Sequence, residues 1–392
     1  MRQAKDPPQL VVGHALAIAD DDQCGRRLAA AADDLARALL DPIHDGERKR
    51  AQQICDSIFH EPDNMCGAHK KQLDEYVRSA HVSGRRGTMT RRMTMNIGSV
   101  ARQANASGVE PALKYVQANG VRFAYLEQGD GPLVMFLHGF PDNAWSYRKQ
   151  LQVFADAGYR AVAPFLRGYA PTEIPADGVF DPIALGKDLE ALIAALSDDG
   201  QARVVGMDWG GTSTFQALAT APSAFKAAVV MNTAHPITIS SIRRDPELVR
   251  AVFHVYFFQL PGAVSAVNTE GLPFVDYLWK LWSPTFNNAE HIRSIKETLS
   301  SPGTMAAALK YYGGLTDAGL AGRLPINNMH TPTLTIYGSN DPTARYSVKE
   351  EPLFKGPHKR IVLPDVGHFP HLEREDEVTG LIMDWFKTHA PD

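Results

Sequence analysis

Hydrophobic residues after residue 110 fall into short continuous runs separated by longer stretches of mixed character. The runs predict strands at Leu133–Leu137, Arg160–Phe165, Val204–Gly206, Ala227–Met231, Thr333–Tyr337 and Arg360–Leu363. The stretches between them predict helices from about Trp145, from Trp209, over Ile183–Leu196 and over Asp376–Thr388. Continuous apolar strands that alternate with helices are typical of a mostly parallel sheet covered on both faces.

Two further patterns frame this alternation. Before the first buried run, the strand-like segments Leu113–Gln117 and Val121–Glu127 flank Asn119-Gly120, a pair that favours a hairpin turn. Between residues 235 and 320 the alternation stops, and the sequence becomes aromatic and helical in pattern. We therefore expect a core made of residues 111–234 and 321–392, with residues 235–320 inserted as a helical cap.

Residues 1–110 differ from the rest, because their helix-like stretches carry many charges and few apolar positions. They are interpreted as an N-terminal extension, helical or disordered. An alternative is that the segment is a translated upstream region, with Met93 or Met95 as the biological start. The spacing of Cys55, His60, Cys66 and His69 matches no common zinc module, so no metal is predicted.

Composition narrows the function classes. The chain has 392 residues, 44% of them hydrophobic, and a net charge of −4, which gives no electrostatic reason to expect nucleic acid or a membrane surface as partner. The cysteines, Cys24, Cys55 and Cys66, are odd in number and lie before the predicted core, which favours a reducing compartment. We expect a cytoplasmic protein.

The stretch Ala202–Ser213 carries the first candidate chemistry. Its pattern Gly206-x-Asp208-x-Gly210 has the spacing of a nucleophile elbow, in which small residues allow a sharp turn that exposes one side chain above the sheet. Here that side chain is a carboxylate, which is already ionised at neutral pH and can attack carbon to form an ester. The alternative is an Asp that merely caps the helix starting at Trp209.

Polar residues at other strand ends complete a possible site, because ligands of open parallel sheets bind beyond the carboxyl ends of the strands. The motif His138-Gly139-Phe140-Pro141 follows the first buried run, Asp341 follows a later strand, and His368 follows the last one. The order Asp208, Asp341, His368 is the nucleophile, acid, base order of α/β-hydrolases.

On these motifs the chain from about Leu113 onward resembles the α/β-hydrolases of the epoxide hydrolase and haloalkane dehalogenase group. The resemblance implies that Asp208 is the nucleophile, His368 the base that activates water, and Asp341 the acid that orients the base. It also implies an oxyanion hole formed by the backbone N–H groups of Phe140 and Trp209, and no cofactor.

Cap residues of this group donate hydrogen bonds to the epoxide oxygen. Tyr312 resembles the later of two such tyrosines. The earlier one usually precedes a Phe-Gln-x-Pro-Gly stretch, which here begins at Phe258 and puts His254 at its place. His254 and Tyr256 are too far apart around a helix to face one pocket. We favour His254, with Tyr256 as the alternative, and expect the pH dependence to reflect the imidazole.

The resemblance favours an epoxide hydrolase that takes a small hydrophobic epoxide and water and acts as a monomer or homodimer. Phe140 stands where many dehalogenases have an Asn that binds halide, whereas Trp209 is common to both subfamilies. A haloalkane dehalogenase with the same triad is the first alternative. A hydrolase-fold protein that binds a ligand without turnover is the second.

Overall fold

The computed structural model describes residues 110–233, 235, 245–313 and 329–391. The predicted extension lies outside these residues apart from Glu110, as do the cysteines and the histidines considered as metal ligands. Among the described helices, none combines the length and the apolar composition that a membrane crossing requires.

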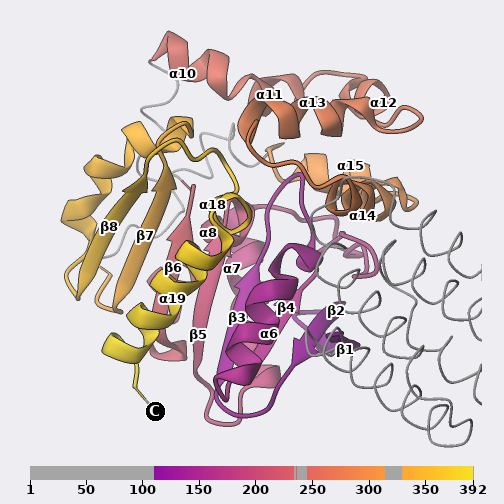
Figure 1. Cartoon of the computed structure of the whole chain (residues 1–392). Coiled ribbons are helices and arrows are strands. Elements are labelled where there is room, and N and C mark those ends of the chain that lie inside the picture. Colours follow the sequence, from indigo (N-terminus) through magenta and orange to yellow (C-terminus); the bar gives the residue numbers. More distant parts are fainter. Residues whose placement is uncertain (1–109, 234, 236–244, 314–328, 392) are drawn as a thin grey trace, which may run out of the picture. The chain divides into compact units, whose positions relative to one another are not determined.

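An eight-stranded sheet with the order β1-β2-β4-β3-β5-β6-β7-β8 forms the centre of the molecule (Figure 1). The strands are β1 (Ala112–Ala118), β2 (Val121–Gln128), β3 (Leu133–Leu137), β4 (Arg160–Pro164), β5 (Ala202–Met207), β6 (Phe225–Met231), β7 (Thr333–Gly338) and β8 (His358–Leu363). The six strands β4, β3, β5, β6, β7 and β8 pair in parallel in this order. Strand β2 is antiparallel to both of its neighbours, β1 and β4. The predicted mostly parallel sheet is confirmed.

The predicted hairpin is also confirmed. Strands β1 and β2 pair from Ala112 with Glu127 to Ala118 with Val121. The turn residues Asn119 and Gly120 both have positive φ, 43° and 75°, which is the conformation that favours Asn-Gly in a two-residue turn.

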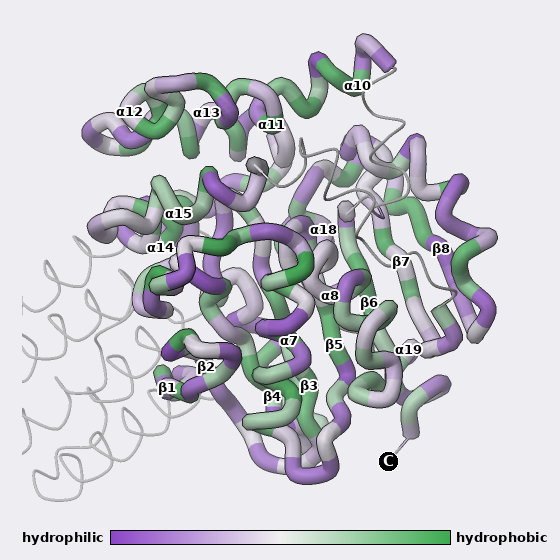
Figure 2. The backbone as a smooth tube through the Cα atoms, turned by 180° about the vertical axis from the view of Figure 1, so that it is seen from behind, coloured by the Kyte–Doolittle hydropathy of each residue, from purple (hydrophilic) through white to green (hydrophobic). Residues whose placement is uncertain are grey.

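Helices cover both faces of the sheet. Helices α6 (Arg148–Asp156) and α19 (Glu375–His389) lie on one face, and α7 (Pro182–Leu196) and α8 (Trp209–Thr220) pack together on the other (Figure 1). The central strands β3, β5 and β6 are fully buried along their apolar positions, and green, the colour of hydrophobic residues, predominates along β3 in Figure 2. Burial on both faces explains why these strands appear in the sequence as continuous apolar runs.

The described residues between β6 and β7 form a second layer of helices above the carboxyl ends of the strands (Figure 1). These are α10 (Pro246–Ala251), α11 (Phe253–Phe257), α12 (Ala263–Val267), α13 (Pro273–Trp282), α14 (Ala289–Ser300) and α15 (Thr304–Lys310). The remaining short helices are η1 (Ala144–Tyr147), η2 (Pro222–Ala224), η3 (Pro342–Arg345), η4 (Ser347–Leu353) and α18 (Pro370–Glu373). We propose that α10–α15 are the cap domain of residues 235–320.

Directional contacts fasten this layer to the loop that follows β3. The indole N–H of Trp279 in α13 donates to the carbonyl of Pro141 at 2.9 Å. The amide of Asn143 donates to Ser294 Oγ at 3.1 Å and to Thr298 Oγ1 at 3.0 Å, both in α14. The helices are therefore held over the strand ends at which polar residues gather.

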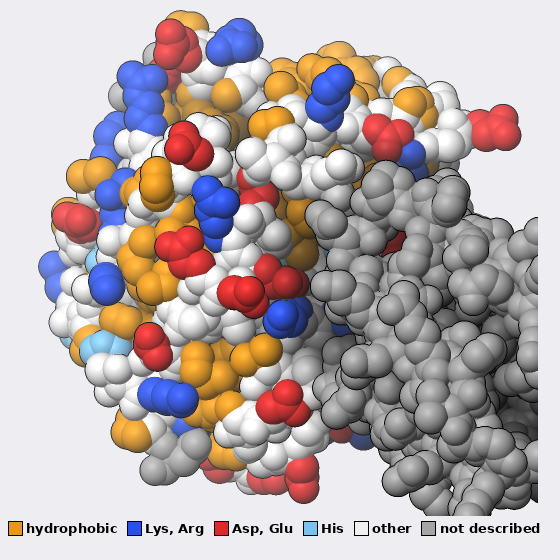
Figure 3. All heavy atoms as spheres, viewed as in Figure 1, with side chains coloured by type: hydrophobic (Ala, Val, Ile, Leu, Met, Phe, Trp, Pro, Cys, Tyr) orange, Lys and Arg blue, Asp and Glu red, His pale blue; other side chains and the backbone are white. Residues whose placement is uncertain are grey.

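Side chains of both charge signs are interspersed over the described surface shown in Figure 3. This distribution agrees with the near balance of acidic and basic residues in the sequence, 44 and 40.

Candidate active site

Asp208 stands at a strained turn between β5 and α8. Its φ of 51° is positive, which is rare for a residue with a side chain and often marks a functional position. A Cβ atom added to Gly206 would lie 2.4 Å from the carbonyl oxygen of Gly210, and one added to Gly210 would lie 2.3 Å from that of Leu137. The two glycines are therefore required by the close approach of backbone to backbone, as the elbow pattern predicts.

The Asp208 side chain makes no capping hydrogen bond to helix α8. Its Oδ1 accepts instead from the backbone N–H of Phe140 at 2.8 Å. The simple helix-cap interpretation of this residue is therefore wrong, because the carboxylate makes no capping bond and accepts a hydrogen bond from the loop after β3.

Burial and hydrogen bonding act in opposite directions on the charge of Asp208. Burial raises the pKa of Asp208 to about 6, against the opposing effects of His368 and of the backbone N–H groups of Phe140 and Trp209. Its side chain still keeps 23% of its surface accessible. A Cβ atom on Gly139 would lie 2.3 Å from Oδ1, so only glycine leaves the carboxylate this position. Asp208 is thus mostly ionised at neutral pH, partly desolvated and still reachable.

His138 holds the loop that carries Phe140. Its Nε2 accepts from the backbone N–H of Leu166 at 3.1 Å, and its Nδ1 lies 2.9 Å from the carbonyl oxygen of Gly139, to which it donates. Burial lowers the pKa of His138 to about 4, so the ring stays neutral and keeps an acceptor nitrogen. Together with the Trp279 bond to Pro141, these bonds hold the backbone of the His138–Pro141 motif.

His368 lies between the two carboxylates. Its Nδ1 is 2.5 Å from Asp341 Oδ2, and its Nε2 is 3.7 Å from Asp208 Oδ2. Because an ionised carboxylate only accepts, we assign the Nδ1 proton to the bond with Asp341. Burial disfavours the imidazolium, but the charges of Asp341 and Asp208 outweigh it and raise the pKa of His368 above 6.5.

Asp341 is fixed in turn by the segment that follows it. It stands at the N-terminus of η3, where its Oδ1 accepts from the backbone N–H of Thr343 at 2.7 Å and from the Thr343 hydroxyl. The other oxygen is left for His368. The structure thus brings Asp341 and Asp208 to the two ring nitrogens of His368.

Of the two candidates on α11, His254 is the one that packs against Tyr312. The His254 ring is buried and lies 5.3 Å from the Tyr312 ring, edge to face. Tyr256 instead packs against the separate cluster of Leu248, Val252 and Tyr346.

The expectation that pH dependence reflects His254 is not supported by the structure. Burial, and then the charge of His368, lower the pKa of His254 to about 3. His254 is therefore a neutral imidazole at every pH near 7, able to donate one proton in a hydrogen bond without titrating.

The adjacent tyrosines after α15 have different surroundings. The Tyr311 hydroxyl donates to the carbonyl of Arg167 at 2.6 Å, so Tyr311 is bound to the core. The Tyr312 ring packs on Phe140 and Trp209, with centroids 5.7 and 5.1 Å away. Burial and then the Asp208 charge raise the pKa of Tyr312 well above 10, so it keeps its proton.

Several buried polar atoms around Asp208 have no hydrogen bond of normal geometry to any described residue. They are Trp209 Nε1, His254 Nδ1, Tyr312 Oη and His368 Nε2. The indole of Trp209 does lie near enough to the Tyr312 hydroxyl to favour its ionised form slightly. Each buried polar group without a partner costs about 1–3 kcal/mol, so four such atoms on residues that pack against one another indicate a place for a polar ligand atom.

Sequence reasoning missed Asn232, which joins three segments of the site. Its side-chain amide donates to the carbonyls of Gly367 and His368, both at 2.8 Å, and its Oδ1 accepts from the backbone N–H of Gly338 at 2.9 Å. Asn232 directly follows β6 and has a φ of 42°. The signal that identified the other positions, a polar residue just after an apolar strand, was present here too.

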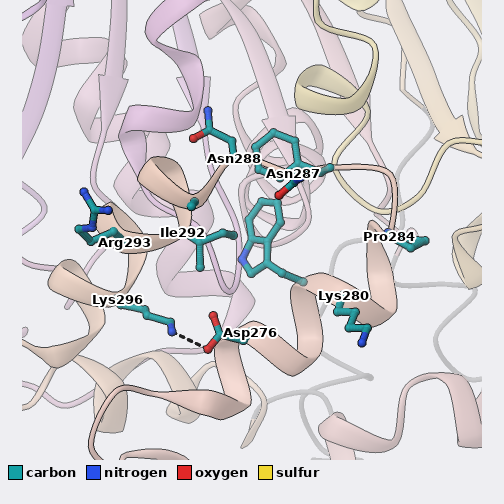
Figure 4. Close-up of a pocket in the computed structure, with 11 residues that line it drawn as sticks. Asp276, Lys280, Pro284, Asn287, Asn288, Ile292, Arg293 and Lys296 are labelled. Atoms are coloured by element: carbon teal, nitrogen blue, oxygen red, sulfur yellow. Dashed lines mark hydrogen bonds and ion pairs between the residues drawn. The ribbon is translucent and has the colours of Figure 1, made fainter. Parts of the chain in front are cut away.

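A surface pocket of about 590 Å³ lies apart from these residues, between α13 and α14. Figure 4 shows Lys296 of α14 directed to Asp276 of α13, and their charged groups are 2.5 Å apart. Trp279 lines the pocket and also binds the loop after β3, but none of the predicted site residues lines it. Within the described ranges, no group of three or more Asp, Glu, His or Cys side chains could hold a metal ion.

Comparisons with known proteins agree with this architecture. The alpha/beta hydrolase fold family model matches residues 132–264. The AB hydrolase superfamily protein YfhM of Bacillus subtilis is 28% identical over 285 residues, which are 70% of this chain and 97% of that protein. Epoxide hydrolase 3 of Xenopus tropicalis is 29% identical over 286 residues, covering 69% of this chain and 76% of that one.

Among solved structures, epoxide hydrolase VrEH1 from Vigna radiata matches with a TM-score of 0.61 and 24% identity, over 71% of this chain and 98% of that one. At this identity the likeness shows the fold. The family model, the relatives and the sheet topology agree, and the chain is an α/β-hydrolase fold protein with many distant epoxide hydrolase relatives.

Proposed function

We propose that the protein opens an epoxide to a vicinal diol through an ester on Asp208. The observation that carries this proposal is a reachable carboxylate at Asp208 together with the Tyr312 hydroxyl and the His254 imidazole, two buried groups whose rings pack against each other among further aromatic rings. An epoxide needs this combination, because its carbon must be attacked while its oxygen receives a hydrogen bond. The aromatic rings around these groups favour a hydrophobic substrate.

In the first half-reaction, Asp208 attacks an epoxide carbon and the C–O bond of the ring breaks. The Tyr312 phenol, whose pKa burial holds well above 10, is protonated and donates to the developing alkoxide. The neutral His254 donates a second hydrogen bond to the same oxygen. The alkoxide finally takes the Tyr312 proton, which leaves an alcohol, the alkyl ester and a phenolate that solvent reprotonates.

In the second half-reaction, the Nε2 of His368 takes a proton from water, and the hydroxide attacks the ester carbonyl. Asp341 stabilises the imidazolium that forms. The N–H groups of Phe140 and Trp209, which already favour the anion of Asp208, stabilise the tetrahedral oxyanion. The intermediate then expels the diol, which takes the proton from His368.

One observation favours haloalkane dehalogenation as the second candidate. The indole N–H of Trp209 is buried beside Asp208 and has no hydrogen bond of normal geometry within the described residues, so it could bind a halide. The Phe140 side chain offers no second donor. Release of bromide from a bromoalkane, with no diol from epoxides, would support this candidate instead.

The proposal is tested by trapping the ester. Replacing His368 with Ala removes the base, so incubation with an aryl epoxide should give a protein whose intact mass is increased by the mass of one epoxide. The double variant with Asp208→Ala should show no increase. Epoxide binding with neither adduct nor diol from the unmodified protein would support a ligand-binding protein without turnover.

A further inference from the structure

The last turn of helix α13 contacts the loop that carries His368. Ser283 follows this helix and is buried, with 1% of its surface exposed. Its Oγ accepts from the backbone N–H of His368 at 3.0 Å and from that of Phe369 at 3.2 Å. The neighbouring carbonyl of Trp282 also accepts from the His368 N–H, at 2.9 Å.

Glu373 in α18 orients the Ser283 hydroxyl. Ser283 Oγ donates to Glu373 Oε1 at 2.6 Å, and both carboxylate oxygens lie 3.1 Å from the backbone nitrogen of Gly367. A hydroxyl has one proton and two lone pairs, so donating to Glu373 leaves Ser283 two acceptor positions for the two loop N–H groups. Every hydrogen-bonding position of this side chain is used.

The two segments approach each other too closely for a side chain at Gly367. A Cβ atom on Gly367 would lie 2.1 Å from the carbonyl oxygen of Trp282. The Trp282 ring lies between His368 and His254, with centroids 5.1 and 4.7 Å away. The same two residues of the helical layer thus contact the backbone and the ring of His368.

We propose that Ser283 is a positioning residue for the base: it couples the helical layer above the site to the His368 loop and holds the imidazole at the angle that water activation needs. The inference rests on the proposed function, because it assigns His368 to ester hydrolysis. Ser283 lies behind His368 and makes no contact with Asp208 or Tyr312 among the contacts of the described residues. Its loss should therefore affect the second half-reaction and spare the first.

The experiment follows both half-reactions in the full chain. Ser283→Ala is mixed with an aryl epoxide, quenched at intervals and analysed by intact mass. We expect adduct formation within about twofold of the unmodified protein and adduct decay slower by about fivefold, because one hydrogen bond contributes about 1 kcal/mol. The adduct should then accumulate during turnover.

Thr285→Ala is the matched control. Thr285 also donates to Glu373, but it makes no hydrogen bond to the His368 loop among the described contacts. Both rates should stay within about twofold of the unmodified protein. If Ser283→Ala does not fold, Glu373→Gln tests the same coupling, since it weakens the acceptor of the Ser283 proton and keeps the volume.

The outcomes separate the two proposals. Unchanged adduct decay in Ser283→Ala, or equal slowing of formation and decay, would overturn the positioning role while the proposed function stands. Absence of both diol and adduct from the unmodified protein would overturn the proposed function and, with it, the role of Ser283.

Discussion

The two sides of the candidate site are held by different forces. The strand-end side, formed by Asp208, Asp341 and His368, is fixed by hydrogen bonds to backbone N–H groups and between side chains. The helical side, formed by Tyr312 and His254, is fixed by packing of aromatic rings, and its Tyr312 Oη and His254 Nδ1 have no hydrogen bond of normal geometry within the described residues.

This difference indicates a division of work. Groups whose hydrogen bonds are already made hold charge in a fixed place, whereas groups with donors to spare can bind an oxygen that becomes negative. We infer that the strand-end side forms and hydrolyses the ester, and that the helical side serves only ring opening.

The largest effect should come from removing the nucleophile. Asp208→Asn keeps the shape of the side chain and tolerates the positive φ, but its amide cannot attack carbon. We expect diol formation to fall by at least about 10⁴-fold, as for other residues whose covalent step cannot be bypassed. A thermal unfolding temperature close to that of the unmodified protein would show that the fold is intact. Substantial diol formation by this variant would contradict the assignment of ester formation to the strand-end side.

The next effect should come from the helical side. Tyr312→Phe removes the proton donor, and adduct formation should slow by about 10²–10³-fold, in the range of general acid catalysis. Adduct decay should change little. Tyr311→Phe is the control: it loses a bond to Arg167, so it should lower stability by about 1 kcal/mol and leave both rates nearly unchanged. Equal effects of the two changes on adduct formation would refute the assignment.

A stability measurement sharpens the comparison at the strand-end side. A Cβ atom at Gly210 meets backbone, so Gly210→Ala should lower the free energy of unfolding by about 2–4 kcal/mol. Gly380 in helix α19 has no atom within 4 Å of its added Cβ, and Gly380→Ala should raise stability by about 0.5–1 kcal/mol. Denaturant unfolding measures the free energy of unfolding of both variants. Similar changes in the two would mean that the turn at Asp208 has room for a side chain at Gly210.

The smallest effect is the pH dependence, which should differ between the half-reactions. Adduct formation needs ionised Asp208, so its rate should fall as pH drops through about 6. Adduct decay needs neutral His368. The two carboxylates raise the pKa of His368, so as the pH is lowered the decay rate should begin to fall at a pH above 6.5. His254, with a pKa of about 3, should add no transition near neutrality, and His254→Phe should leave both pH profiles in place. A profile that shifts in this variant would show that His254 titrates.

That Asp208 and Asp341 both lie near His368 could be expected from the sequence for a physical reason. Buried parallel strands are continuous apolar runs, and residues just after them must gather at one edge, so the positions of Asp208, Asp341 and His368 followed from local pattern. The confirmed fold follows from the same alternation.

The helical side was less predictable. The choice between His254 and Tyr256 depends on the rotation of α11, a helix of only five residues. Burial also sets the pKa of His254, which no local pattern shows. The proposed positioning role of Ser283 and its bond to Glu373 depend on contacts between segments some 90 residues apart. No local sequence pattern near either residue indicates this role.

The central claim is that the ester forms on Asp208, and a single turnover in water enriched in ¹⁸O tests it most directly. With enzyme in excess over an aryl epoxide, the hydroxide attacks the ester carbonyl, so one ¹⁸O should appear in the Asp208 carboxylate, read by mass spectrometry of its peptide. The first diol should carry no label, since its new oxygen comes from Asp208. Label in the diol with Asp208 unlabelled would mean that water attacks the epoxide directly, and would contradict the account.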